Sequence, residues 1–129
     1  MILLDTQVVL WLAVAPDKIS RRAAEAIGTE RRAGGVAISD KTLWELAMIL
    51  IRKPMEIDLD LRETLEATER NFMVLPINAA IAERSVQFKR SFPADPADRL
   101  IASTAIVHGL PLVTADAQIR KSGEVLCIW

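Results

Sequence analysis

The sequence has one cysteine, one histidine and no tyrosine, and each scarcity narrows the chemistry open to the chain. The lone Cys127 excludes an intramolecular disulfide and fits a reducing compartment. The only histidine, His108, is expected at the end of a helix, and there is no G-x-S-x-G segment to present a serine nucleophile. With three tryptophans and three phenylalanines, aromatic residues are too few to favour a stacking platform for single-stranded nucleic acid.

Long apolar runs and glycine-rich phosphate loops are also missing. The longest apolar run, Val8–Ala15, is far shorter than the ~20 residues that a membrane-spanning helix needs. The chain begins Met-Ile-Leu-Leu-Asp without a basic n-region, so we expect no signal peptide, no membrane contact and a cytoplasmic location. Neither G-x-x-x-x-G-K-[ST] nor G-x-G-x-x-G occurs, so nucleotide binding of those two kinds is not indicated.

What remains is a chain of 129 residues with 51% apolar content, enough to fold as one domain spanning 1–129. Its 16 basic and 17 acidic residues give a net charge of −1. The chain as a whole therefore does not attract nucleic acid, and any such binding must rest on local groups.

Apolar segments of strand length alternate with longer segments of helical periodicity. We expect strands at 2–4, 36–38, 72–75, 112–114 and 125–128. We expect helices at 6–14, 20–33, 40–52, 60–70, 79–89, 96–108 and 116–121, with Ser20, Ser39 and Asn78 as N-caps. The alternation predicts an α/β domain with a parallel β-sheet of about five strands and α-helices on both faces.

Two acidic residues directly follow expected strands. Asp5 closes Ile2–Leu4, and Asp116 follows the strand at 112–114. Ligands of open parallel sheets bind beyond the carboxyl ends of the strands, so the two side chains would meet there if these strands are neighbours. Capping of the next helix explains each of the two residues about equally well when it is taken alone.

Glu45 lies in a helix that is apolar nearly all round, and we therefore expect the helix at 40–52 to be buried. An ion pair of Glu45 with Lys41 or Arg52 is the structural alternative. A carboxylate at this place in a buried helix is better explained as a metal ligand.

The segment Asp95-Pro96-Ala97-Asp98 opens another apolar helix. Asp95 fits an N-cap followed by proline at the first helical position. Capping explains Asp98 less well, because Ile101 and Ala105 share its face of the helix. Asp98 therefore joins the candidates for a functional carboxylate.

Four carboxylates without nearby cationic partners favour a divalent cation. Burying each charge costs several kcal/mol unless it is paired, hydrogen-bonded or bound to a metal. Mg²⁺ and Mn²⁺ prefer such oxygen ligands, and they can activate a water while neutralising a leaving oxygen. The pattern therefore indicates a metal-dependent enzyme that cuts phosphodiesters, with four candidate ligands: Asp5, Glu45, Asp98 and Asp116.

With these residues assembled, the whole chain resembles a PIN-domain ribonuclease, and in particular the VapC-type toxins of bacterial toxin–antitoxin pairs. Four segments carry the resemblance in the family's order and spacing: Ile2-Leu-Leu-Asp-Thr6, Ser39 to Glu45 with Leu-Trp-Glu-Leu-Ala, Asp95-Pro-Ala-Asp-Arg-Leu-Ile-Ala102, and Leu112-Val-Thr-Ala-Asp116. The segment that begins at Asp95 resembles a motif found in one subgroup of the family. The chain departs from that subgroup in two places: the subgroup often has an aromatic residue where Ala97 stands and a histidine where Pro93-Ala94 stands.

The resemblance implies a Mg²⁺- or Mn²⁺-dependent endoribonuclease that cleaves single-stranded or loop RNA. It also implies a homodimer and a cognate antitoxin that blocks the site. It carries the four acids over as catalytic metal ligands and adds four supporting residues: Thr6 and Thr114 as hydroxyls that order waters or carboxylates, Asp95 as an additional acid, and Arg99 as a contact to phosphate or to the acids.

Contacts to RNA would come from basic side chains, with Lys89-Arg90 as the preferred pair among Lys41, Arg52, Lys53, Lys89, Arg90 and Arg99. The apolar stretch Val8–Leu12 is expected to pack in the core, and part of it to form a groove for an antitoxin helix.

Two other functions compete with the nuclease. The first is a non-catalytic PIN-like interaction module, against which the presence of all four acids argues. The second is a phosphotransfer domain of receiver or haloacid-dehalogenase type. The dehalogenase type needs an Asp at position 7, where this chain has Gln7, and the receiver type needs a Lys that no later strand supplies cleanly.

Overall fold

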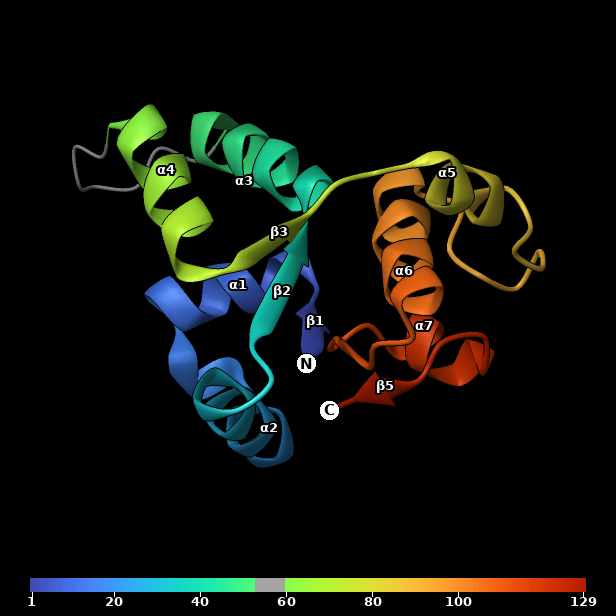
Figure 1. The fold of residues 1–129 in the computed structure, drawn as a ribbon, viewed down its shortest axis with the longest axis horizontal. Helices are drawn as coiled ribbons and strands as arrows, with labels where there is room; N and C mark the ends of the chain where they lie inside the picture. The colour runs from blue at the N-terminus through green and yellow to red at the C-terminus, as the bar shows by residue number, and fades with distance from the viewer. Residues whose placement is uncertain (53–59) are drawn as a thin grey trace.

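The computed structural model describes residues 1–52 and 60–129 as a single α/β domain. Its five strands are all parallel and lie in the order β3-β2-β1-β4-β5 (Figure 1). The strands are β1 (Ile2–Leu4), β2 (Val36–Ser39), β3 (Met73–Leu75), β4 (Leu112–Val113) and β5 (Cys127–Ile128). The predicted parallel sheet of about five strands is confirmed.

Helices cover both faces of this sheet, also as predicted (Figure 1). They are α1 (Thr6–Val14), α2 (Arg21–Arg32), α3 (Asp40–Arg52), α4 (Leu61–Asn71), α5 (Ala79–Ser85), α6 (Pro96–His108) and α7 (Ala117–Ser122), with the short 3₁₀ helix η1 (Pro16–Lys18) after α1. In the described part of the chain, none of these helices combines the length and apolarity needed to cross a membrane.

The central strand β1 explains why the chain needs two layers of helices. Ile2 and Leu4 pack into one apolar cluster with α1, α2 and α3, while Leu3 packs into the opposite cluster with α6 and α7. All three side chains are at most 3% exposed. A strand that is buried on both faces reads as an unbroken apolar run, which is what the sequence shows.

The three predicted N-caps form as expected. Ser20 Oγ accepts from Ala23 N at 3.1 Å, and Asn78 Oδ1 accepts from Ile81 N at 3.0 Å. Ser39, the last residue of β2, accepts from Lys41 N at 3.1 Å. Each contact satisfies a backbone N–H group that has no partner within its helix.

The predicted helix at 79–89 is too long. It ends at Ser85, and a loop follows as far as Asp95. Phe88 and Phe92 leave the helical path to stack at 4.0 Å between ring centroids, and both are buried against α6. Burial of two aromatic rings outweighs the helical propensity of the segment.

The expectation that α3 is buried nearly all round is also wrong. Only Thr42 and Leu46 are buried in it, whereas the side chains of Trp44 and Ile51 are 55% and 67% exposed. α3 packs against β2, α1, α4 and α6, and its remaining surface is open to solvent. This open face lies directly beside Glu45.

Candidate active site

The acidic residues meet where the strand order of the sheet reverses. β1 lies between β2 and β4, which follow it on opposite sides, and a crevice opens at the carboxyl end of such a switch point. Asp5 follows β1 there, and Asp116 lies three residues beyond β4. The backbone N–H of Asp5 donates to the Val113 carbonyl at 3.0 Å, which fixes the two strand ends side by side.

Asp5 is held by two contacts. Its Oδ1 accepts from Thr6 N at 2.8 Å as the N-cap of α1, and its Oδ2 accepts from the Thr114 hydroxyl at 2.8 Å. The same Thr114 oxygen accepts from Asp116 N at 3.1 Å. Thr114 therefore ties the two strand-end acids into one unit, and it is fully buried.

Glu45 reaches the crevice from α3. Its Oε1 accepts from the Thr6 hydroxyl at 2.7 Å, and Thr6 Oγ1 lies 3.1 Å from Thr42 Oγ1. A carboxylate can only accept and a hydroxyl has one hydrogen, so Thr6 donates to Glu45 and Thr42 donates to Thr6. No ion pair of Glu45 with Lys41 or Arg52 occurs in the described structure, which excludes the structural alternative there.

Asp98 lies in the first turn of α6, beneath its N-cap Asp95. Asp95 Oδ1 accepts from Ala97 N at 2.8 Å and from Asp98 N at 3.4 Å, so the capping prediction for Asp95 is confirmed. The side chain of Asp98 lines the crevice. Asp116 caps α7 in the same way, accepting from the backbone N–H groups of Gln118 and Ile119 at 2.8 and 3.0 Å.

All four candidate acids line one cavity of about 350 Å³. Each comes from a different element, and the N-termini of α1, α6 and α7 open onto it. The other residues that line it are Thr6, Gln7, Ile49 and Ala115. The sequence pattern thus located a single carboxylate-lined crevice.

Three of the candidate acids have raised pKa values, with burial as the largest cause in each and repulsion by neighbouring carboxylates as a further one. Burial, and after it the charges of Asp5, Asp95, Asp116 and Glu45, raise the pKa of Asp98 to about 7. Such a shift marks a place where negative charge is already in excess and where a cation would be favoured.

Burial also raises the pKa values of two other candidate acids, Asp5 and Glu45. Burial raises the pKa of Asp5 in spite of its hydrogen bonds to Thr114 and Thr6, and the charge of Asp116 adds to the rise. Burial likewise raises the pKa of Glu45 against the hydrogen bond from Thr6, and the charge of Asp5 adds to it.

The donor set fits a hard divalent cation. Within residues 1–52 and 60–129, no group of three or more acidic, histidine or cysteine side chains is arranged so that it could hold a metal ion. Mg²⁺ keeps several of its waters and takes only one or two protein carboxylates directly, so it does not require such a compact group. All four candidate ligands offer oxygen, the donor that Mg²⁺ and Mn²⁺ prefer.

Arg99 is placed differently from the expectation that it faces phosphate or the acids. Its Nε donates to the Pro93 carbonyl at 2.8 Å, and its guanidinium lies 6.0 Å from the ring centroid of Phe88. In this structure Arg99 therefore holds the loop that leads into Asp95.

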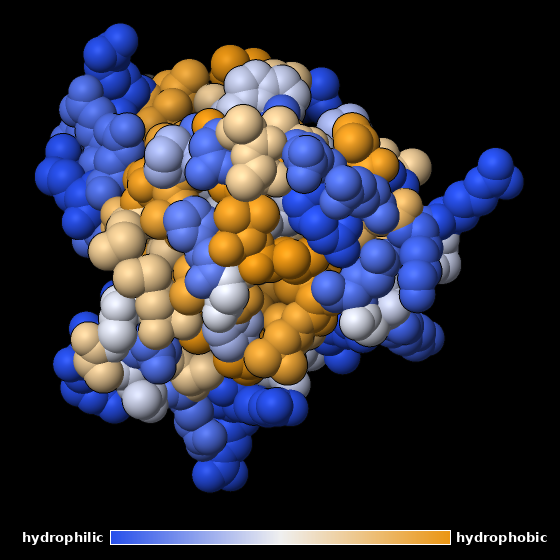
Figure 2. Space-filling model, turned by 45° about the vertical axis from the view of Figure 1, so that its right-hand side comes forward, coloured by the Kyte–Doolittle hydropathy of each residue, from blue (hydrophilic) through white to orange (hydrophobic). Residues whose placement is uncertain are grey.

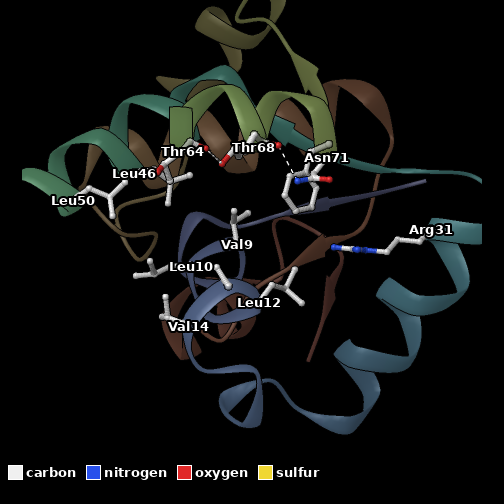
Figure 3. Close-up of a pocket in the computed structure, with 13 residues that line it drawn as sticks. Val9, Leu10, Leu12, Val14, Arg31, Leu46, Leu50, Thr64, Thr68 and Asn71 are labelled. Atoms are coloured by element: carbon white, nitrogen blue, oxygen red, sulfur yellow. Dashed lines mark hydrogen bonds between the residues drawn. The ribbon is translucent and has the colours of Figure 1, made fainter. Parts of the chain in front are cut away.

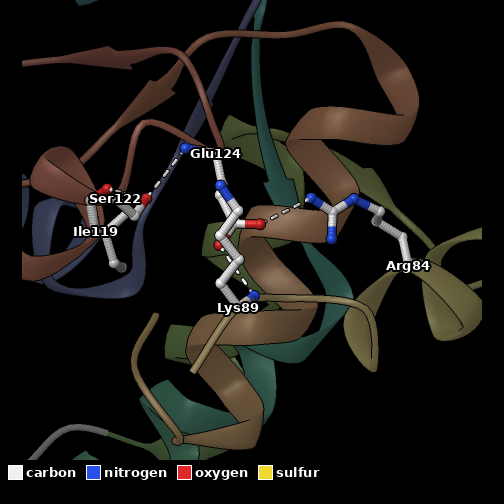
Figure 4. A network of polar contacts seen from close by, with 5 residues as sticks. All are labelled: Arg84, Lys89, Ile119, Ser122 and Glu124. Carbon is white, nitrogen blue, oxygen red and sulfur yellow. Dashed lines mark hydrogen bonds and ion pairs between the residues drawn. The ribbon is translucent and has the colours of Figure 1, made fainter. Parts of the chain in front are cut away.

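A second set of contacts ties the same loop to Glu124, which follows α7 (Figure 4). Glu124 Oε2 accepts from Lys89 N at 3.2 Å, and Glu124 Oε1 lies 3.6 Å from Arg84 Nη2. The Arg84 guanidinium stacks over the Phe88 ring, 4.2 Å from its centroid. The exposed Lys89-Arg90 pair thus lies on an anchored loop, whereas Lys89 was predicted to end the helix at 79–89.

The other basic candidates lie near the crevice on α3. Lys41 Nζ lies 3.8 Å from the ring centroid of Trp44, and Arg52 lines the same cavity as these two residues. Lys53 lies outside the described residues.

An apolar groove lies between α1, α3 and α4, away from the acids (Figure 3). Its volume is about 350 Å³, and Val9, Leu10 and Leu12 contribute to its wall. Leu50 of α3 and Ala67 of α4 face them across the groove. Part of the stretch Val8–Leu12 therefore forms a groove, as predicted.

Thr42 was missed as a candidate site residue. It is fully buried and completes the hydroxyl chain through Thr6 to Glu45. Its position one helical turn before Glu45, on the same face of α3, was the available signal.

Comparison with known proteins identifies the family to which the chain belongs. The PIN domain family model matches residues 2–125. Ribonuclease VapC22 of Mycobacterium tuberculosis is 33% identical over 120 residues, covering 93% of this chain and 90% of the relative. The chain therefore belongs to the PIN-domain family.

Two solved structures share the fold at low sequence identity. VapBC2 of Rickettsia felis, bound to a DNA fragment from its promoter, aligns with a TM-score of 0.75 at 17% identity, covering 98% of this chain and 97% of the other. VapBC-1 of nontypeable Haemophilus influenzae aligns with a TM-score of 0.72 at 18% identity, covering 98% and 96%. The predicted resemblance to PIN-domain and VapC proteins is confirmed.

Proposed function

We propose that this protein is a metal-dependent endoribonuclease of the VapC type, with residues 1–129 acting as one PIN domain in the cytoplasm. The observation that carries the proposal is the convergence of four carboxylates, from four separate elements, on one cavity at the switch point of the sheet. The 33% identity to a protein named Ribonuclease VapC22 supports the choice of RNA as the substrate.

Asp5, Glu45, Asp98 and Asp116 would hold Mg²⁺ or Mn²⁺ as the catalytic residues of this site. When bound, such an ion supplies an activated water and neutralises charge on the leaving oxygen of the phosphodiester. The chain positions its own ligands through hydroxyls: Thr114 orients Asp5, and Thr6 orients Glu45. These contacts fix the direction of each carboxylate, as outer-shell partners do in metal sites.

The two remaining supporting residues act on α6. Asp95 caps the helix that carries Asp98, and its charge contributes to the raised pKa of Asp98. Arg99 secures the loop before Asp95 through its contact to Pro93, so its role in this proposal is positional.

The antitoxin would bind in the groove between α1, α3 and α4. An amphipathic helix in an apolar groove is a common mode of peptide recognition, and the wall formed by Leu10 and Leu12 suits its apolar face. Ala67→Arg should block inhibition by the cognate antitoxin while RNA cleavage persists. Glu69→Arg, on the exposed side of the same helix, is the matched control.

A second copy of the chain is the proposed partner in a homodimer. Figure 2 shows a face on which hydrophobic residues gather near the centre and hydrophilic ones surround them. Several large apolar side chains are open to solvent, among them Val86 at 78% and Met73 of the edge strand β3 at 49%. Sedimentation of the purified protein tests this directly.

The nuclease activity is tested by incubating the purified protein with a mixed pool of single-stranded RNA. Cleavage should occur with Mn²⁺ or Mg²⁺, stop with EDTA, and be absent from Asp98→Asn. If antitoxin-free wild-type protein cuts nothing, the non-catalytic interaction module becomes the better account. The chain has Gln7 where a phosphotransfer domain of the dehalogenase type needs an Asp, and this argues against that function.

A further inference from the structure

The open face of α3 exposes a tryptophan next to the candidate metal ligands. Trp44 precedes Glu45 in the chain, and its side chain is 55% exposed. The Lys41 ammonium covers the ring at 3.8 Å from its centroid, a cation–π contact that holds the indole in place. Because one face carries this contact and more than half of the side chain remains exposed, the exposed area belongs mainly to the other face and to the ring edge.

Trp44 also lines a second cavity, of about 320 Å³, that adjoins the acidic one. Glu45 and Ile49 line both cavities, so the two lie side by side. Lys41 and Arg52 line this second cavity too, on the same helix as Trp44. Its volume falls within the range of about 300–1,000 Å³ typical of small-molecule sites.

The two cavities differ in charge in a way that matches a nucleotide chain. One cavity is lined by four carboxylates that need a cation, and the other by an aromatic ring and two basic side chains, together with the carboxylates of Glu45 and Asp95. Single-stranded nucleic acid is bound elsewhere by this same combination, with bases stacked on aromatic rings and phosphates on basic groups.

We propose that Trp44 is a base-stacking residue that receives the nucleotide next to the scissile phosphate of a single-stranded RNA, with Lys41 and Arg52 facing its phosphates. This deepens the proposed nuclease function and rests on it. In this role Trp44 selects where the RNA is cut, because a base that stacks well beside the acids places the neighbouring phosphate over them.

The test compares Trp44→Ala, Trp44→Phe and wild type in steady-state cleavage of single-stranded RNA oligonucleotides with Mn²⁺. Loss of one base stack should raise KM by about 5- to 150-fold in Trp44→Ala. The change in kcat should be much smaller, and base preference beside the cut should flatten. Trp44→Phe keeps a ring and should retain most of the affinity. Leu126→Ala, equally apolar and exposed at the other end of the sheet, should match wild type.

Tryptophan fluorescence separates failure of this proposal from failure of the nuclease function. With EDTA present, RNA should quench the emission of wild type but not that of Trp44→Phe. If wild type cuts RNA and Trp44→Ala has an unchanged KM, the stacking role is overturned and the nuclease function stands. If wild type cuts nothing, quenching that depends on Trp44 still supports stacking, and its absence overturns it. A Trp44→Ala protein that changes oligomeric state, with Trp44→Phe equally impaired, would assign this face to a second copy and overturn the proposal.

Discussion

The Thr6 hydroxyl donates a 2.7 Å hydrogen bond to Glu45, and this contact joins the first helix of the chain to the third. Thr6 is 4% exposed, so the bond forms largely out of water, where a displaced hydroxyl would find no substitute. The direction of Glu45 in the crevice is therefore set by a residue that directly follows Asp5 in the sequence.

Replacing Thr6 should impair cleavage without removing any candidate ligand. Thr6→Val keeps the shape of the side chain but leaves Glu45 without its donor, and loss of such a partner typically lowers metal affinity or activity by about 10- to 100-fold. Thr6→Ser retains the hydroxyl and should recover most of the activity. The exposed Thr29→Val serves as the control, and equal activity of the Val and Ser variants at position 6 would contradict the role.

Metal-free Asp98→Asn should be more stable than wild type at neutral pH. The pKa of Asp98 is about 7 in the fold against 3.8 for the free group, so the native state holds more protons between these values. Its contribution to the free energy of unfolding therefore falls as pH rises from about 4 to 7. The asparagine of the variant carries no charge, so the variant does not lose this stability. At pH 8 its free energy of unfolding should exceed that of wild type by on the order of 1 kcal/mol, which is less than the full pKa shift implies because the side chain is partly open to solvent.

Urea unfolding of both proteins in EDTA, across this pH range, measures the effect. The difference between variant and wild type should be small at pH 4 and grow toward pH 8. A difference that stays constant with pH would show that Asp98 does not carry the excess negative charge.

Glu124→Ala should release the loop that leads into Asp95. Glu124 is an ion-pair partner of Arg84 and accepts from the backbone of Lys89, and its side chain is 11% exposed. Loss of both contacts should lower the free energy of unfolding by about 1–3 kcal/mol. Amide hydrogen exchange at 86–94 should speed up, and cleavage should weaken mainly through KM.

The control for that experiment is Glu25→Ala, which breaks the exposed Arg21–Glu25 pair and should change stability by at most about 1 kcal/mol. Unchanged exchange in the 86–94 loop of Glu124→Ala would mean that the stacked phenylalanine rings alone hold it.

The sequence predicted most of the sheet and the place where the candidate acids meet, because both depend on short-range signals. Strand-end acids follow apolar runs that are typical of buried parallel strands, and parallel strands bring their carboxyl ends together. The register of β1 against β4, with Leu4 opposite Val113, then places Asp5 beside the segment that carries Asp116. Order and spacing were sufficient for this result.

Contacts between distant segments could not be predicted from these local sequence patterns. The periodicity of 79–89 favours a helix, but stacking of Phe88 on Phe92 beneath Arg84 ends it early. Arg99 lies beside an acid in the sequence, yet its Nε donates to the Pro93 carbonyl of the loop.

Composition does not report where the few aromatic residues lie. A count of three tryptophans argued against a stacking platform, but a count does not reveal that one of them, Trp44, lies exposed beside Glu45. Exposure depends on which face of α3 meets the sheet, and an apolar helix does not disclose that face.

Calorimetric titration with Mn²⁺ tests the central claim most directly. The proteins to compare are wild type and the single variants Asp5→Asn, Glu45→Gln, Asp98→Asn and Asp116→Asn. Asp60→Asn, a capping residue of α4, makes the same charge change away from the crevice. Each crevice variant should bind Mn²⁺ more weakly than wild type, while Asp60→Asn should bind it equally well. Unchanged affinity in both Glu45→Gln and Asp98→Asn would contradict a shared cation site built by the four carboxylates.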